Sequence, residues 1–327
     1  MTLLLKLIFA AFIAFLVSLA LGPFTIKLLH RLKFGQSIRT DGPQTHLKKA
    51  GTPTMGGVLI LFSLVIGLLF VRALSPVVLW LIFLTLSFGL IGLVDDLIII
   101  VTKKSLGLTA RQKLFAQILF AGLAVFFMIR NQFPTSQLVP FSNLQLTFPA
   151  GGFGNPVFFL YAVFVIVAFS NAVNLTDGLD GLAGGTTAIA ALFLGALTLF
   201  QHQPDLAIFS FALAGACVGF VWFNGPPAQV FMGDTGSLAL GAGLAGISLF
   251  SQMSLFFVIV GGIFVAENLS VVIQVTSYKT TGKRVFRMSP IHHHFELGGM
   301  VEPKIMIRFW IIGIALGSIG ILGYIIR

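Results

Sequence analysis

The sequence has very little charge and almost no cysteine. Only 9% of its 327 residues are Asp, Glu, Lys or Arg, whereas 57% are hydrophobic and the mean hydropathy is +1.02. Soluble domains carry about a quarter charged residues, so the composition excludes an ordinary water-soluble globule. The single cysteine, Cys217, excludes disulfides within the chain and cysteine-based metal sites.

Long apolar runs fill most of the chain instead. A helix needs about 20 apolar residues to cross the hydrocarbon core of a bilayer, and ten runs approach this length. We therefore predict an all-α polytopic membrane protein whose ten transmembrane helices form one domain over residues 1–327. The predicted spans are 3–22, 55–72, 77–94, 114–130, 157–171, 183–200, 206–223, 236–250, 254–276 and 306–326.

The net charge of +10 is distributed unevenly between the two sides of these spans. Sixteen of the 20 Lys and Arg lie at the ends of, or between, spans one and two, three and four, and nine and ten. Because connections rich in positive charge stay in the cytoplasm, we predict that these connections are cytoplasmic and that both termini are periplasmic or extracellular. A basic face suits anionic membrane lipid or a phosphorylated substrate. No separate basic domain exists, so we expect no nucleic-acid partner.

The acidic residues show the same asymmetry, although acids contribute little to orientation. Only Asp205 of the ten acidic residues falls on the predicted outer side. The outer connections are short except for residues 131–156, where alternating polar and apolar residues predict a small hairpin. The concentration of acids near the cytoplasmic side therefore needs an explanation other than topology.

Two adjacent carboxylates end the third span, in the sequence GLVDDLI. Asp95 and Asp96 repel each other at the edge of an apolar helix, which costs free energy unless a cation or basic groups offset them. Mg2+ takes hard oxygen ligands and often keeps water and phosphate in its shell. The alternative is that the pair merely ends the helix in water.

A second polar cluster lies between the fifth and sixth spans, in NAVNLTDGLDGLAGG. Its four polar side chains recur every three residues, which groups them on one face of a helical turn. The glycines among them let a ligand or another backbone approach closely. Helix capping explains one of these residues but not all four. The four are Asn171, Asn174, Asp177 and Asp180.

The stretch FNGPPAQVFMGDTGSLALG leads into the eighth span. Free amides at a helix start form an anion site, and Asp234 could hold a metal ion beside it; the alternative is a plain helix cap by Asp234 or Thr235. Phe231 could stack on a base or simply pack. In the first connection, Lys48 and Lys49 precede GTPTMGG, where they could be ordinary interface charge.

Three consecutive histidines occur in RMSPIHHHFELGG. A structural zinc site needs four ligands, usually Cys and His at fixed spacing, and three adjacent side chains diverge too far to supply them. Imidazoles beside Arg284 and Arg287 suit hydrogen bonds to phosphate or carboxylate groups, so we predict a polar lip that faces the substrate. Glu267, inside the ninth span, has either a functional role or a buried packing partner. The triplet is His292, His293 and His294, in the predicted cytoplasmic connection 277–305.

Carboxylates, basic side chains, glycine loops and helix starts on one membrane face are the parts that phosphoryl transfer needs. One substrate would be a soluble phosphate compound, and the other a lipid that reaches the site sideways from the bilayer. An ion-coupled transporter also buries acids, but its sites lie near the bilayer midplane within repeated halves. No internal repeat is visible here.

Five motifs carry a resemblance to a known family: GTPTMGG, DD, NAVNLTDGLDGLAGG, FMGDTGSLALG and SPIHHHFE. Their order and loop spacing are similar to those of the polyprenyl-phosphate N-acetylhexosamine-1-phosphate transferases, over essentially the whole chain. GTPTMGG and the histidine triplet favour the muramoyl-pentapeptide branch over the branch that uses UDP-N-acetylglucosamine, which remains the alternative.

The resemblance implies ten transmembrane helices, a cleft that faces the cytoplasm, and a place in the bacterial cytoplasmic (inner) membrane. It implies transfer of phospho-N-acetylmuramoyl-pentapeptide from its UDP conjugate, UDP-N-acetylmuramoyl-pentapeptide, to undecaprenyl phosphate. The products would be lipid I and UMP, and Mg2+ would be required. The family also suggests a homodimer.

The resemblance also assigns roles. Asp95 and Asp96 belong to the catalytic region, with Asp95 the favoured base for the lipid phosphate, and Asp234 binds Mg2+. We predict direct attack by the lipid phosphate; in a rival two-step scheme Asp234 is the nucleophile. Phe231 stacks on uracil. The implied substrate contacts are Lys49, Thr54, Asn171, Asn174, Asp177, Gly178, Leu179, Asp180, Asn224, Phe231, His292, His293 and His294.

Overall fold

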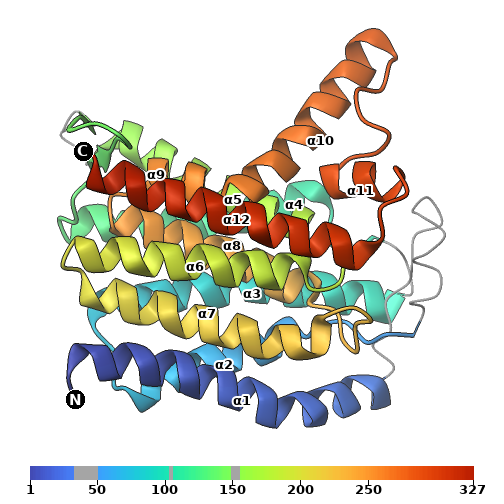
Figure 1. Cartoon of the computed structure of the whole chain (residues 1–327), viewed down its shortest axis with the longest axis horizontal. Coiled ribbons are helices and arrows are strands. Elements are labelled where there is room, and N and C mark those ends of the chain that lie inside the picture. The colour runs from blue at the N-terminus through green and yellow to red at the C-terminus, as the bar shows by residue number, and fades with distance from the viewer. Residues whose placement is uncertain (33–50, 103–105, 149–154) are drawn as a thin grey trace.

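The computed structural model describes residues 1–32, 51–102, 106–148 and 155–327 (Figure 1). This part of the chain is a bundle of helices stacked side by side, with one two-stranded sheet at its edge. The long helices are α1 (Leu3–Arg31), α2 (Gly57–Phe70), α3 (Pro76–Thr102), α4 (Ala110–Arg130), α5 (Pro156–Thr176), α6 (Leu182–Phe200), α7 (Pro204–Asn224), α8 (Gly233–Phe250), α10 (Gly262–Thr281) and α12 (Glu302–Ile325). Two short helices, α9 (Ser254–Val260) and α11 (Ile291–Glu296), complete the bundle.

Each of the ten predicted spans overlaps a helix, but the count of ten is not confirmed. Among the described residues, seven helices are long and apolar enough to cross a membrane, namely α1, α3, α4, α5, α6, α7 and α12. A bent pair, α9 with α10, raises the number to eight. Helix α2 has only 14 residues. The chain is therefore a multi-pass membrane protein.

Helix α8 lies at the centre of the bundle, where every residue from Thr235 to Phe250 is buried. Its sequence, GDTGSLALGAGLAGISLF, is rich in glycine, alanine and serine, so neighbouring helices can approach closely. A side chain at Gly92 of α3 would place its Cβ 2.0 Å from the backbone oxygen of Asp234. This close crossing brings the end of α3 against the start of α8.

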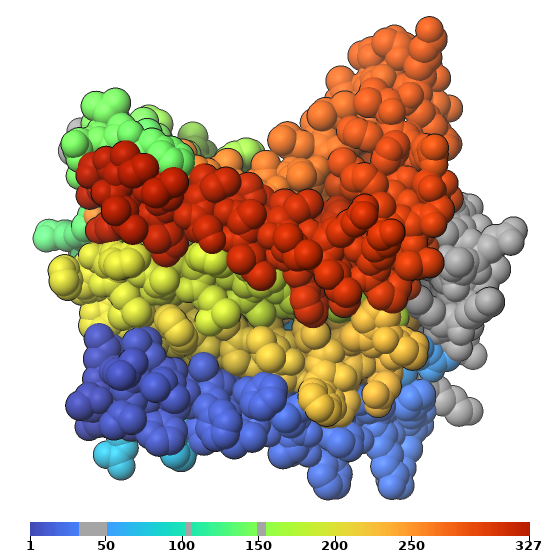
Figure 2. All heavy atoms as spheres, in the orientation of Figure 1, coloured from blue at the N-terminus to red at the C-terminus, as the bar shows by residue number. Residues whose placement is uncertain are grey.

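The ninth predicted span is not one straight helix. Helices α9 and α10 meet at an angle of 83°, and α10 leaves the bundle as an arm that projects beyond the other helices (Figures 1 and 2). Apolar side chains on this arm are exposed, including Leu269, Val272, Ile273 and Val275. The short helix α11 lies beside the arm, between it and α12.

A small hairpin lies at the end of the bundle where both termini are found (Figure 1). Strands β1 (Gln137–Leu138) and β2 (Gln145–Leu146) pair antiparallel, with Gln137 opposite Leu146. The buried Gln137 side chain accepts a hydrogen bond from the backbone N–H of Ser254 at 3.1 Å, which ties the hairpin to the start of α9. The end of α3, the start of α8 and helix α11 lie at the opposite end of the bundle.

Candidate active site

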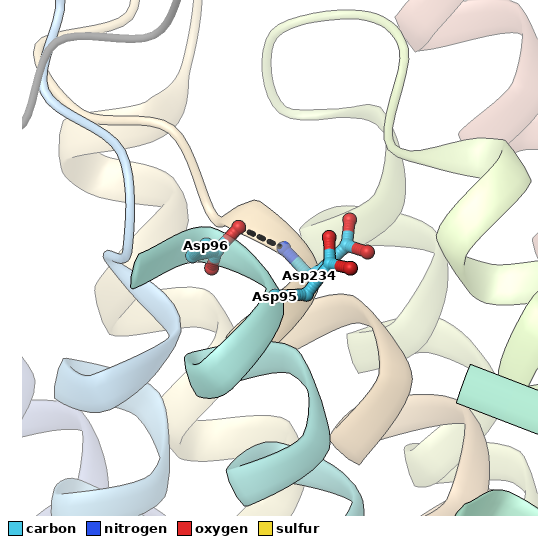
Figure 3. Close-up of side chains that lie close together, drawn as sticks. All are labelled: Asp95, Asp96 and Asp234. Carbon is cyan, nitrogen blue, oxygen red and sulfur yellow. Dashed lines mark hydrogen bonds between the residues drawn. The ribbon is translucent and has the colours of Figure 1, made fainter. Parts of the chain in front are cut away.

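Three aspartates from two helices meet where α3 crosses the start of α8 (Figure 3). One carboxylate oxygen of each of Asp95, Asp96 and Asp234 lies within 4.8 Å of the others. Asp95 and Asp96 are 3% and 6% exposed, whereas 25% of the Asp234 side chain is exposed. The cluster is therefore reached from outside at Asp234.

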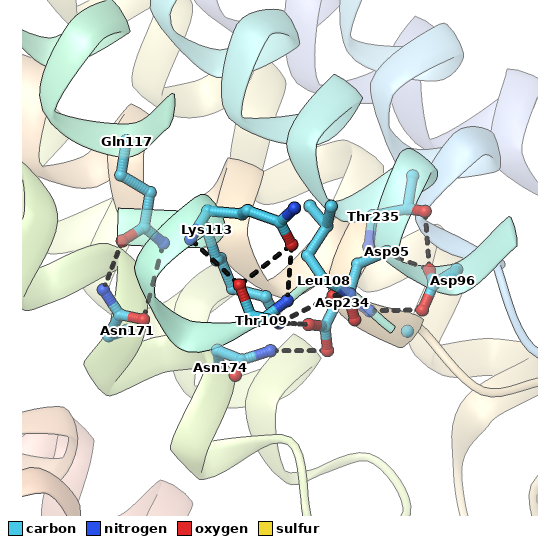
Figure 4. A network of polar contacts seen from close by, with 12 residues as sticks. Asp95, Asp96, Leu108, Thr109, Lys113, Gln117, Asn171, Asn174, Asp234 and Thr235 are labelled. Carbon is cyan, nitrogen blue, oxygen red and sulfur yellow. Dashed lines mark hydrogen bonds and ion pairs between the residues drawn. The ribbon is translucent and has the colours of Figure 1, made fainter. Parts of the chain in front are cut away.

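A lysine joins two of these carboxylates. Lys113 Nζ lies 2.6 Å from Asp234 Oδ2 and 3.2 Å from Asp95 Oδ1 (Figure 4). The same Asp95 oxygen accepts a hydrogen bond from the backbone N–H of Leu108 at 2.8 Å. Thr109 and Gln112 form a capping box that starts α4 at Ala110, so Lys113 lies one turn into the helix. Its ammonium offsets part of the repulsion between the two carboxylates.

Asp96 has a different task, because it caps helix α8 from the neighbouring helix. Its Oδ1 accepts from the backbone N–H of Asp234 at 3.2 Å, and its Oδ2 accepts from the N–H and hydroxyl of Thr235 at 3.0 and 2.7 Å. The first amides of a helix have no partner within the helix, and a negative charge is favourable there. Asp96 therefore fixes the start of α8, and with it the position of Asp234.

The asparagines of α5 support the same cluster. Asn174 Nδ2 donates to Asp234 Oδ1 at 2.8 Å and to Ser237 Oγ at 2.9 Å. Asn171 instead exchanges amide hydrogen bonds with Gln117 of α4, at 2.9 and 3.4 Å (Figure 4). Residues three apart on one helix thus face two different neighbours. Asn174 contacts the acidic cluster, and Asn171 joins α5 to α4.

Asp177 follows directly after α5 and lies near the cluster. Burial raises its carboxyl pKa from the usual 3.8 to about 8, and the negative charges of Asp234, Asp96 and Asp180 add to this effect. A proton on Asp177 at neutral pH relieves the repulsion among four neighbouring acids. A cation placed among them would favour its release.

The GTPTMGG segment packs directly on the segment before α8. The backbone N–H of Phe231 donates to Pro53 O at 2.8 Å, and the N–H of Gly56 donates to Phe231 O at 2.8 Å. Gly233 has a φ of +73°, and a Cβ there would lie 2.6 Å from Asp96 Oδ2 and 2.8 Å from Thr54 Oγ1. Thr54 is thus buried beside the acidic cluster. Lys49, also predicted for the site, lies outside the described residues.

The loop between α5 and α6, residues 177–181, is held by several elements. The backbone N–H of Asp180 donates to Glu302 Oε1 at 2.7 Å, and Asp180 Oδ2 accepts from the N–H of Ala228 at 2.9 Å. Asn224 accepts from the N–H of Gly181 at 3.0 Å and donates to Val230 O at 2.9 Å. The Leu179 side chain is buried in an apolar cluster with Leu182, Ile263, Ile305 and Phe309.

The three histidines of α11 have three different surroundings. His292 is 1% exposed, and its Nδ1 lies 3.0 Å from Oε1 of the buried Glu267. His293 Nδ1 lies 3.0 Å from Glu296 Oε2, and His294 Nδ1 accepts from the backbone N–H of Arg287 at 3.1 Å. His292 faces the protein interior, where Glu267 and the 177–181 loop enclose it. Substrate binding by the triplet stays a prediction.

The acidic cluster fits a divalent metal ion. Among the residues that the structure describes, Asp95, Asp96 and Asp234 are the group of metal-ligating side chains close enough to share one ion. Carboxylate oxygens are the ligands that Mg2+ prefers. Both oxygens of Asp96 accept from backbone N–H groups that start α8, whereas the partners of Asp234 are the side chains of Asn174 and Lys113. Because side chains can turn aside for an ion, Asp95 and Asp234 are the carboxylates best able to bind one.

Three residues of the site were not predicted from the sequence: Lys113, Thr235 and Glu302. Lys113 is one of the 16 basic residues that indicate orientation, and Thr235 is predicted only as a possible helix cap. One signal was available for Lys113, since the capping sequence Thr109–Gln112 places it in the second turn of a mostly apolar helix. Glu302 gives no comparable signal, because its partner Asp180 is 122 residues away in the sequence.

Comparison with known proteins places the chain in a family. Residues 77–252 match the sequence profile of glycosyl transferase family 4, and residues 49–61 match signature 1 of the phospho-N-acetylmuramoyl-pentapeptide-transferases. The chain is 46% identical over 319 residues to the phospho-N-acetylmuramoyl-pentapeptide-transferase of Bacillus subtilis (strain 168), covering 96% of this chain and 97% of that one. Proteins of the same name from Geobacillus sp. (strain WCH70) and Desulforudis audaxviator (strain MP104C) are 48% and 49% identical over the same shares. The chain therefore belongs to glycosyl transferase family 4 and, as the motifs predicted, to its phospho-N-acetylmuramoyl-pentapeptide-transferases.

Proposed function

We propose that this protein transfers phospho-N-acetylmuramoyl-pentapeptide from UDP-N-acetylmuramoyl-pentapeptide to undecaprenyl phosphate, which gives lipid I and UMP. The observation that carries the proposal is the meeting of Asp95, Asp96 and Asp234 at one end of a membrane-spanning bundle, in a chain 46% to 49% identical to named transferases. Phosphoryl transfer depends on positioning and on neutralising charge around phosphate oxygens, and this cluster supplies groups for both.

In the proposed mechanism the lipid phosphate attacks directly. One of its oxygens forms a bond to the β-phosphorus of the donor, the bond from that phosphorus to the bridging oxygen breaks, and the electron pair leaves on UMP. Asp95 would accept the proton of a monoprotonated lipid phosphate, and Lys113 would offset charge between Asp95 and Asp234. The rival is a two-step scheme with a covalent intermediate on Asp234, whose oxygens accept from Asn174 and Lys113.

We assign the metal site to Asp234 with Asp95, and Mg2+ as its ion. When bound, Mg2+ would neutralise charge on the donor diphosphate. Asp96 supports the site through α8, and Asn174 orients the Asp234 carboxylate. Asp177, protonated at neutral pH in the described structure, would lose its proton to the ion's field.

The donor nucleotide is proposed to bind where the 177–181 loop meets the segment before α8. Phe231 is held by backbone hydrogen bonds to Pro53 and Gly56, which leaves its partly exposed ring to stack on uracil. Gly178 and Asp180 would line the site, and Asn224 holds the loop by accepting a hydrogen bond from the Gly181 N–H. Lys49, Thr54, His293 and His294 would complete the substrate contacts, whereas Leu179 and Asn171 contribute through packing and helix pairing.

The arm α10 supports a lipid acceptor. It leaves the bundle at 83° and exposes apolar side chains next to the end that carries the acidic cluster, so a lipid chain could lie against it while its phosphate reaches Asp95. We propose that this end faces the cytoplasm, with ten spans in the bacterial inner membrane and both termini outside. Lys279, Lys283, Arg284, Arg287, Lys304 and Arg308 at this end favour that orientation. The expected homodimer stays a prediction.

Purified protein in detergent tests the proposal. With undecaprenyl phosphate and Mg2+ present, UMP release is expected from UDP-N-acetylmuramoyl-pentapeptide and not from UDP-N-acetylglucosamine, together with an extractable lipid product. Chelation of the metal should stop both. UMP release from the N-acetylglucosamine donor alone would assign the chain to the other substrate branch. A phosphorylated enzyme trapped on Asp234 without lipid would refute direct attack.

A further inference from the structure

Glu267 is a buried carboxylate that the proposed mechanism does not use. It lies in α10 and is 0% exposed, and burying a charge in a membrane protein is costly unless a partner compensates it. Both of its oxygens face one residue: Oε1 lies 3.0 Å from His292 Nδ1, and Oε2 accepts from the backbone N–H of His292 at 3.4 Å. The hydroxyl of Ser270 bonds the backbone oxygen of Glu267 and leaves the carboxylate to His292.

His292 connects this carboxylate to the 177–181 loop. Its ring is turned so that neither nitrogen has an aligned hydrogen bond among the described residues, although Nδ1 is at ion-pair distance from Glu267. The Nε2 edge lies against Gly178, where a Cβ would come within 2.2 Å of Nε2. The imidazole of His292 therefore occupies the space that a side chain at position 178 would need.

The rest of the loop is fixed by hydrogen bonds from other elements. Glu302 accepts from the Asp180 N–H, and Asn224 accepts from the Gly181 N–H. No hydrogen bond is described at Gly178, so the imidazole contact is what holds this part of the loop. A carboxylate at ion-pair distance from one ring nitrogen of a histidine orients the ring, and here the opposite nitrogen, Nε2, lies against Gly178.

We propose that Glu267 is a positioning residue for the donor nucleotide: it holds the His292 imidazole against Gly178, and so keeps the 177–181 loop in the shape that binds the nucleotide. The inference rests on the proposed function, because that function places the donor at this loop. It gives α10 a second task besides facing lipid, since the arm that would contact the acceptor also supports the donor loop.

The first test is Glu267→Gln, which removes the charge and keeps the size of the side chain. The Kd for UMP and the KM for UDP-N-acetylmuramoyl-pentapeptide are each expected to rise about tenfold, as losses of interactions with charged groups do. The KM for undecaprenyl phosphate should stay within about twofold, as for independent sites. UMP affinity unchanged in Glu267→Gln would overturn the proposal. The control is Asp205→Asn, which likewise replaces a carboxylate by an amide but lies in the first turn of α7, away from α10 and the 177–181 loop in sequence.

A double-mutant cycle separates positioning from general stability. If Glu267 acts through His292, Glu267→Gln should weaken UMP binding in the wild-type background and have no further effect in His292→Gln. Effects on UMP binding that multiply in the double variant would contradict the proposal. The midpoint of thermal unfolding, measured in parallel, shows whether each variant remains folded.

A steric test covers the case in which Glu267→Gln does not fold. Gly178→Ala should displace the imidazole and weaken UMP binding, and the same change should matter less in a His292→Ser background, where the space is open. Equal effects in both backgrounds would overturn the proposal. Failure of the proposed function looks different: the wild-type protein would then release no UMP from the donor, whatever the variants do.

Discussion

At the scale of single residues, the three aspartates are chemically equal but structurally different. Asp96 uses both oxygens to cap α8, Asp95 shares one oxygen between Leu108 and Lys113, and Asp234 is the member most open to solvent. The sequence predicted that these acids matter, because adjacent carboxylates at a span end are costly. The separate roles of the three acids could not be predicted from the sequence, because the contact that makes Asp96 a cap joins it to Thr235, 139 residues away.

Asp177 gives a pH-dependent prediction at this scale. Its pKa is raised from 3.8 to about 8. Between pH 3.8 and about pH 8, the folded protein therefore binds a proton that the unfolded chain lacks. The free energy of unfolding falls as the pH rises through this window. Mg2+ binding at pH 7 should therefore release protons. Calorimetry in two buffers of different ionisation enthalpy measures this release, which should shrink in Asp177→Asn and at pH values well above 8. Equal proton release by wild type and Asp177→Asn would refute the assignment.

At the scale of elements, the apolar runs predicted where helices occur but not how they bend. The run 254–276 reads as one span, yet α9 and α10 meet at 83°. The adjacent glycines Gly261 and Gly262 mark the break and were the available signal. The burial of His292 could not be predicted for a related reason. It depends on the arm that the bend positions, and a local pattern of three histidines contains no information about that arm.

The cap on α8 gives a prediction at the element scale. Asp96→Asn replaces an acceptor oxygen by an NH2 group that faces backbone N–H donors, so it should lower the free energy of unfolding by about 1–3 kcal/mol. Asp95→Asn should lower turnover with a much smaller change in stability, because Asp95 caps no helix. Thermal unfolding of both variants in detergent is the measurement. A stable Asp96→Asn variant would show that α8 does not need this cap.

At the scale of the whole molecule, the bundle separates two ends. Termini and the β1–β2 hairpin lie at one end, and the acidic cluster, the 177–181 loop and α11 at the other. The central helix α8 is lined with small residues, so that α3 can cross it closely and bring Asp95 and Asp96 to Asp234. Motifs from distant parts of the sequence thus meet because the bundle is tightly packed at its centre.

We propose that Asp95 and Asp234, with Asp96 beside them, hold one divalent ion. Mn2+ in place of Mg2+ allows direct counting by electron paramagnetic resonance of free and bound ion. We expect one Mn2+ per chain in the wild-type protein, affinity at least about tenfold weaker in Asp234→Asn and in Asp95→Asn, and no change in Asp205→Asn. Mn2+ binding that persists unchanged in both Asp95→Asn and Asp234→Asn would contradict it.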